Sequence, residues 1–178
     1  REGTVPYLKK MGEEFGFTVN VVDPIQLDGL TVSSSHVREL IEAGNMESAR
    51  KFLGRYYSIF GPVISGYKTG QAIGFPTANI DTTKVQIPGT GVYAVRMIYQ
   101  KKPYEAVANI GFNPTFQRDR LSVEVHIFDF SQAIYGKEIE VEFISRIRSE
   151  IEFKSKGDLV VQIKKDIEQA KTILAKLN

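Results

Sequence analysis

The chain has 178 residues, of which 42% are hydrophobic and 25% charged, and 23 Lys and Arg against 21 Asp and Glu give a net charge of +2. This composition predicts a folded domain, and it excludes a disordered tail or a strongly basic nucleic-acid-binding protein. The absence of cysteine excludes disulfides, thiolate zinc sites and a cysteine nucleophile. No apolar run approaches the roughly 18 residues of a membrane helix, and no signal peptide is evident. We therefore expect a soluble, cytoplasmic protein that binds neither membranes nor nucleic acid.

The N-terminal part has helical and extended patterns in turn. Apolar residues three or four apart predict a short helix over residues 5–15. The apolar run over residues 17–22 predicts a strand, which Pro24 ends.

A second helical region follows. The serines at 33–35 precede Val37 and Leu40, as is typical of a capped helix start. Gly44 ends this helix, and the apolar spacing predicts another short helix over residues 46–53.

The chain changes character near Gly54, and short β-rich runs bounded by Gly, Pro, Asn and Asp extend to about Phe143. The predicted strands lie at residues 57–60, 91–98, 105–109, 122–128 and 139–143. This spacing is typical of an antiparallel barrel or sandwich. An apolar stripe from Leu159 to Leu177 predicts a C-terminal helix, with Asp158 as its cap. A closed barrel with this helix packed against it is the simplest assembly.

Three glycines at four-residue spacing, Gly66, Gly70 and Gly74, are the first candidate functional feature. Such glycines let the backbone approach a polyphosphate closely. The spacing matches neither a Walker loop nor the dinucleotide fingerprint, and a plain flexible hairpin explains the glycines equally well.

Thr77 and Asn79 make the case for a phosphate site more specific. Residues two apart on a strand point to the same side, and both offer the neutral oxygens that Mg²⁺ accepts beside water and substrate phosphates. The alternative is that they only complete a turn after Pro76.

Glu124 lies in an alternating strand in which Val123 and Val125 face the core. If the opposite face lines a pocket, Glu124 is placed to accept a proton from an attacking hydroxyl. The alternative for Glu124 is that it is simply solvated. For His126, on the same face, a structural role is the alternative to a catalytic one.

Two later segments are less specific. The polar segment over residues 109–120 suits either a lid or an ordinary hairpin loop. Arg148 and Phe153 are suited to enclosing a flat ring, or belong to a surface cluster of charges.

The combination of motifs is specific, although each motif alone is weak. In chain order they are Gly70-x-x-x-Gly74-Phe-Pro-Thr-Ala-Asn79, Pro88-x-x-Gly91-Val-Tyr93, Asn109-Ile-Gly111 with Pro114-Thr115, Val123-Glu-Val-His126, Tyr135-Gly136, and Arg148 with Phe153. This series resembles the riboflavin kinase family over roughly residues 55–178.

The resemblance implies a mainly β fold, a six-stranded antiparallel Greek-key barrel with a C-terminal helix. It also implies transfer of the ATP γ-phosphoryl group to the 5′-hydroxyl of riboflavin, giving FMN and ADP. Thr77 and Asn79 would hold Mg²⁺, with Mn²⁺ and Zn²⁺ as alternatives, and Glu124 would be the general base.

The resemblance further implies two binding regions. The ATP-binding residues would be Gly66, Lys68, Gly70, Gly74, Pro76, Thr77 and Asn79. The flavin-binding residues would be Arg148, Glu152 and Phe153, and residues 109–120 would form a lid. The family commonly has Arg after the middle glycine, and Gln71 stands there in this chain, so ATP binding would either be weaker or rely on Lys68.

Residues 1–54 resemble the end of the FMN adenylyltransferase domain of bifunctional bacterial FAD synthetases, an α/β nucleotidyltransferase domain. Ser34, Ser35 and Arg38 match its phosphate-holding helix start, with Ser35 where threonine is usual. The His-x-Gly-His motif is absent, and the chain starts with Arg1. We therefore expect a remnant over residues 1–54, a kinase domain over 55–178, and FAD synthesis from FMN and ATP only in a full-length parent.

Two other classes of function stay open. The barrel could be a non-catalytic flavin- or nucleotide-binding module, or an oligonucleotide-binding fold. An oligonucleotide-binding fold predicts cations and aromatics interleaved on one strand face, whereas the lysines here lie in scattered pairs. The sequence does not indicate an oligomeric state.

Overall fold

The computed structural model describes residues 3–66, 69–83, 85–112 and 121–177. The chain divides into two compact units, residues 1–33 and 34–178.

The first unit contains one helix and one small hairpin. Helix α1, Val5–Phe15, begins after Thr4, whose side chain accepts from the Tyr7 amide, and ends at Gly16 with a φ of 74°. Strands β1, Gln26–Leu27, and β2, Leu30–Thr31, pair antiparallel. The strand predicted over residues 17–22 is wrong: this segment is irregular. A strand needs a partner for its backbone groups, and no described residue pairs with this segment.

The second unit opens with the two predicted helices. Helix α2, Ser34–Glu42, starts within the serine cluster, and helix α3, Met46–Leu53, follows it. Gly44 has a φ of 74° between them, and the Asn45 side chain accepts from the Ser48 amide to cap α3. The buried faces of α2 and α3 belong to the same apolar cluster as the barrel interior.

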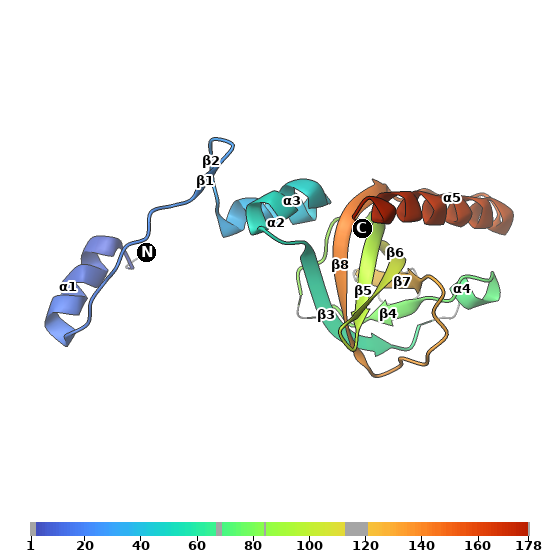
Figure 1. Cartoon of the computed structure of the whole chain (residues 1–178), viewed down its shortest axis with the longest axis horizontal. Coiled ribbons are helices and arrows are strands. Elements are labelled where there is room, and N and C mark those ends of the chain that lie inside the picture. The colour runs from blue at the N-terminus through green and yellow to red at the C-terminus, as the bar shows by residue number, and fades with distance from the viewer. Residues whose placement is uncertain (1–2, 67–68, 84, 113–120, 178) are drawn as a thin grey trace. The chain divides into compact units, whose positions relative to one another are not determined.

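Six antiparallel strands close a barrel in the order β3-β4-β7-β6-β5-β8 (Figure 1). Their bounds are β3 Tyr57–Ile64, β4 Ala78–Ile80, β5 Gly91–Tyr99, β6 Lys102–Phe112, β7 Leu121–Ile127 and β8 Glu138–Arg148. Strands β5, β6 and β7 follow one another, and β8 returns to the far side of β5, which is a Greek key. The predicted fold class is confirmed.

Alternation along each strand separates an inner from an outer face. On β7, Val123, Val125 and Ile127 are buried in the interior cluster. Their neighbours Glu124 and His126 point outward and are half-buried. The outer face of β4, β6 and β7 is therefore where the polar candidates gather.

Helix α5, Lys156–Leu174, packs on the outer face of the barrel against β5, β6 and β8 (Figure 1). Its Ala170 and Leu174 form a second apolar cluster with Val92 and Val107. The predicted cap is wrong, because the side chain of Ser155 accepts from the Asp158 amide at 3.1 Å. Asp158 instead lies in the first turn, where its negative charge interacts favourably with the positive end of the helix dipole.

The turn between α2 and α3 lies against the barrel. A β-carbon at Gly44 would be 2.6 Å from the Tyr93 hydroxyl and 2.9 Å from Cδ of Arg146. Tyr93 Oη donates to the Gly89 carbonyl, and burial raises the pKa of this phenol, so it stays a donor at neutral pH. The compact unit thus includes α2 and α3, while the predicted domain limits of 1–54 and 55–178 stay a prediction.

A substitution at Phe143 tests the assignment of the barrel interior. The Phe143 side chain is fully buried, and its ring meets that of Tyr93 edge-on at 5.5 Å between centroids. Phe143→Ala should lower the free energy of unfolding by about 3–5 kcal/mol, because it removes apolar contacts and leaves a cavity. Denaturant unfolding measures this. The matched control is Phe60→Ala on β3, where the side chain is 60% exposed and the change should stay within about 0.5 kcal/mol. Equal losses would contradict the assignment of the interior.

Candidate active site

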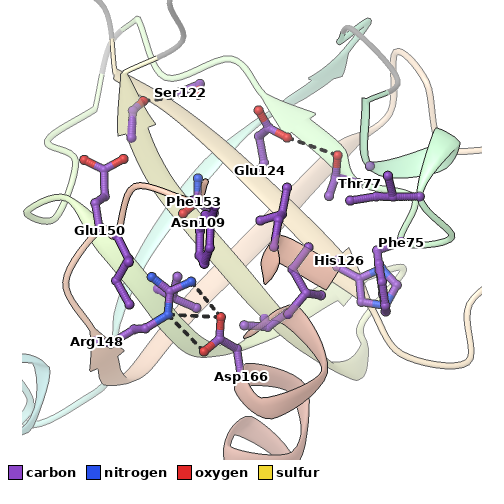
Figure 2. Close-up of a pocket in the computed structure, with 18 of the residues that line it drawn as sticks. Phe75, Thr77, Asn109, Ser122, Glu124, His126, Arg148, Glu150, Phe153 and Asp166 are labelled. Carbon is purple, nitrogen blue, oxygen red and sulfur yellow. Dashed lines mark hydrogen bonds and ion pairs between the residues drawn. The ribbon is translucent and has the colours of Figure 1, made fainter. Parts of the chain in front are cut away.

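A cavity of about 660 Å³ lies between the outer face of the barrel, α5 and the helical turn α4, Thr69–Ala72. Its walls combine apolar groups with a few polar side chains (Figure 2). The polar and charged residues that line it are Thr77, Asn109, Ser122, Glu124, His126, Arg148, Glu150 and Asp166. An apolar cavity with few convergent polar groups is the usual form of a small-molecule site.

Glu124 and Thr77 meet at one side of this cavity (Figure 2). The Thr77 hydroxyl donates to Oε2 of Glu124 at 3.2 Å. In the strand register Glu124 stands opposite Asn79 of β4 and Asn109 of β6. Three neighbouring strands thus place one carboxylate and two amides in a row on the same face, beside the threonine.

Asn79 is half-buried and is not among the residues lining the cavity. A β-carbon at Gly66 would lie 2.1 Å from Nδ2 of Asn79, so the Gly66 backbone lies directly against this amide. The start of the glycine-rich segment therefore lies against the Thr77–Asn79 segment.

The turn that follows needs two of its glycines. A β-carbon at Gly70 would lie 2.3 Å from the Phe75 carbonyl, and Gly74 has a φ of 90°. Both features hold the backbone that leads into Pro76 and Thr77. Lys68, a predicted phosphate contact, lies outside the described residues, and Gln71 is exposed.

His126 fixes the same segment from β7. Its Nδ1 lies 2.8 Å from the Pro76 carbonyl, and since a carbonyl only accepts, this nitrogen carries the proton. The ring also meets Phe75 edge-on at 5.7 Å. His126 thus anchors the residue before Thr77 to the strand that carries Glu124.

Of the three predicted flavin-binding residues, two line the cavity and one does not. Arg148, at the end of β8, and Phe153 line the cavity, with the guanidinium carbon 5.9 Å from the ring centroid. Glu152 is exposed and does not line it.

The remaining predicted residues lie elsewhere. Ser34, Ser35 and Arg38 are exposed in the first turns of α2, away from the cavity lining. Of the predicted lid, residues 109–112 belong to β6, and residues 113–120 lie outside the described residues.

The donors beside Glu124 suit a hard cation. Within the described ranges no three His, Cys, Asp or Glu side chains converge as a metal cluster. The threonine hydroxyl, the Asn79 amide and one carboxylate are all oxygen donors. Mg²⁺ characteristically takes one or two protein ligands and completes its shell with water and phosphates.

Sequence reasoning missed Asp166 and Glu150 in the cavity lining. Asp166 carried a signal: it lies three residues after Ile163 and four before Ala170, on the apolar stripe of α5. A charged residue on a buried helical face requires a partner. Glu150 carried no such signal, because its position rests on the contact with Gly111, where a β-carbon would be 2.1 Å from its Oε1.

The chain matches the family model described as Flavokinase, riboflavin kinase, over residues 53–174. The chain belongs to the riboflavin kinase family. The oligonucleotide-binding alternative is accordingly not favoured.

The names of similar curated proteins agree with this family assignment. The chain is 44% identical over 172 residues to the bifunctional riboflavin kinase/FMN adenylyltransferase of Haemophilus influenzae, covering 96% of this chain and 56% of the relative. It is 45% identical over 143 residues to the protein of the same name from Bacillus subtilis, covering 78% of this chain and 45% of the relative. The chain thus spans about half the length of these relatives.

A solved structure from Streptococcus pneumoniae, titled as a macrolide-efflux protein, matches with a TM-score of 0.81 at 36% identity. The match covers 92% of this chain and 54% of that one. It supports the fold. In the part of the chain that the structure describes, no helix is both long and apolar enough to cross a membrane.

Proposed function

We propose that this chain transfers the γ-phosphoryl group of ATP to the 5′-hydroxyl of riboflavin, forming FMN and ADP. The observation that carries the proposal is the Thr77–Glu124 hydrogen bond at the edge of an apolar cavity, with Asn79 in register with Glu124. The name shared by the relatives supports a longer parent that also converts FMN and ATP to FAD. We expect the enzyme to act in the cytoplasm.

Glu124 would act as the general base. Its carboxylate accepts the proton of the 5′-hydroxyl as that oxygen bonds to the γ-phosphorus, and the bond between this phosphorus and the bridging oxygen breaks to release ADP. The Thr77 hydroxyl donates to Oε2, which fixes the orientation of the carboxylate.

The oxygens of Thr77 and Asn79 would hold Mg²⁺, which would neutralise charge on the nucleotide phosphates. Gly66 and Gly70 keep backbone close to these side chains, and peptide N–H groups of such a glycine-rich segment would be donors for a phosphate. Orientation and charge neutralisation, more than proton removal, determine the rate of phosphoryl transfer.

The far end of the cavity would receive the flavin ring. Arg148 and Phe153 lie there together with apolar side chains of the barrel and α5. An arginine face beside an aromatic suits a planar heteroaromatic ring. We assign no flavin contact to Glu152, because it lies outside the lining.

A product assay tests the proposed function. The purified chain is incubated with riboflavin, ATP and Mg²⁺, and riboflavin, FMN and FAD are separated by chromatography. FMN that depends on both ATP and Mg²⁺ is expected. Flavin left entirely as riboflavin, with the chain folded by circular dichroism, would refute the kinase assignment.

His126 offers a test of the anchoring of Pro76. His126→Phe keeps a ring but removes the hydrogen bond to the Pro76 carbonyl. We expect kcat/KM to fall about 3- to 10-fold, since one net hydrogen bond is worth about 1 kcal/mol. The control is His36→Phe on α2, where the ring packs edge-on with Phe52 at 4.8 Å and does not line the cavity. Steady-state kinetics on both variants measures this, and equal values would contradict the anchoring role.

A further inference from the structure

Asp166 is a charged side chain inside the second unit. It lies on α5 and is only 4% exposed, and it is the one charged residue that is buried among the described residues. Because burial of an unpaired carboxylate is costly, its contacts decide its role.

The carboxylate of Asp166 is held by two neighbours, Arg148 and Gln162. Figure 2 shows the contacts with Arg148. Arg148 donates from Nε to Oδ1 at 3.0 Å and to Oδ2 at 3.1 Å, and from Nη2 to Oδ2 at 2.7 Å. Gln162, one turn earlier on α5, donates to Oδ1 at 2.8 Å. Both carboxylate oxygens are therefore engaged, which leaves Asp166 poorly placed to accept a proton from a substrate.

The same contacts fix the plane of the Arg148 guanidinium. Its third nitrogen, Nη1, donates to the Ser149 carbonyl at 2.9 Å, so all three nitrogens have protein partners. The group remains next to the Phe153 ring, 5.9 Å from the centroid, and lines the cavity. A side chain with many rotamers is held in one orientation at the ring-binding end.

Packing alone does not require this pair. Replacing a buried ion pair by apolar side chains of similar size is often neutral or stabilising, because desolvation offsets the attraction. The helix α5 already packs on the barrel through Ala170 and Leu174. A buried Asp166 is better explained by what it does to Arg148.

We propose that Asp166 is a positioning residue for riboflavin: through its bidentate contact it holds the Arg148 guanidinium plane as one side of the flavin-ring site. This rests on the proposed function. It makes α5, a helix outside the barrel, part of substrate recognition, although Asp166 itself touches no reacting atom.

The test compares Asp166→Asn with a matched pair elsewhere on the barrel. Asn keeps the shape and removes the charge. Arg96 and Glu142 form an ion pair at 2.8 Å outside the cavity lining, so Glu142→Gln is the control. For Asp166→Asn we expect the Kd for riboflavin, from flavin fluorescence, and its KM to rise about 10-fold. The KM for ATP and the kcat at saturating riboflavin should change less than about twofold, and Glu142→Gln should change none of the four.

A double-mutant cycle shows whether Asp166 acts through Arg148. In an Arg148→Met background, Asp166→Asn should raise the Kd for riboflavin no further. Independent, additive effects would overturn the proposal, as would an unchanged Kd in Asp166→Asn alone.

The variant Arg148→Met/Asp166→Leu separates positioning from folding. It replaces the ion pair by an apolar pair, so its thermal midpoint should match or exceed that of the wild type, while riboflavin affinity stays about 10-fold weaker. Wild-type affinity in this folded variant would overturn the proposal. Failure of the wild-type chain to form FMN would instead refute the proposed function, even if the affinity changes appear.

Discussion

Glu124→Gln should lower kcat for FMN formation by about 10²–10⁴-fold, because the amide accepts no proton from the attacking hydroxyl. The side chains are nearly isosteric, and the Thr77 hydroxyl can still donate to the Gln carbonyl oxygen in place of Oε2. Affinities for riboflavin and Mg-ATP should therefore stay close to those of the wild type. Single-turnover kinetics, which isolates the chemical step, is the measurement.

A control distinguishes this loss from a general effect of removing a carboxylate. Glu140 lies on β8, is half-buried like Glu124, and does not line the cavity. Glu140→Gln should leave the rate unchanged. If Glu124→Gln also retains the wild-type rate, Glu124 is not the base.

The barrel could be predicted from the sequence because the alternation of apolar and polar residues along a strand is a local property. Val123, Val125 and Ile127 are buried while Glu124 and His126 face outward, as the two-residue period of a strand predicts. The local patterns of α1, α2 and α3 likewise marked those helices.

Local patterns failed where tertiary contacts decide. The apolar run over residues 17–22 has strand-like composition but remains irregular, because no described strand pairs with it. At the start of α5 both Ser155 and Asp158 are suitable caps, and only backbone geometry selects Ser155.

The candidate site shows the same division. Chemistry alone left Thr77, Asn79 and Glu124 with plain structural alternatives, and the motif resemblance brought them together. Their proximity depends on the register of β4 with β7, which joins segments far apart in the chain. The Arg148–Asp166 pair depends on how α5 packs on the barrel. No short sequence motif predicts that packing.

Asn79→Ala should weaken Mg-ATP binding about 10- to 100-fold while the Kd for riboflavin stays nearly unchanged, because one proposed oxygen ligand is lost and the flavin end is untouched. Isothermal titration with ATP, at several Mg²⁺ concentrations, measures this. The loss should depend on Mg²⁺ rather than appear as a uniform fall in affinity. An unaltered Mg-ATP affinity would remove Asn79 from the metal site.

Gly66 supplies the companion variant, because its backbone lies against the Asn79 amide. A β-carbon there would be 2.1 Å from Nδ2 and 2.7 Å from Cγ, so Gly66→Ala must displace the amide and should reproduce the nucleotide defect. In the Asn79→Ala background the colliding atoms are gone, and Gly66→Ala should add little. Such non-additivity is expected when one change acts through the other residue. If the two losses instead add, Gly66 contributes through its own backbone contact with the phosphates and not through the placement of Asn79.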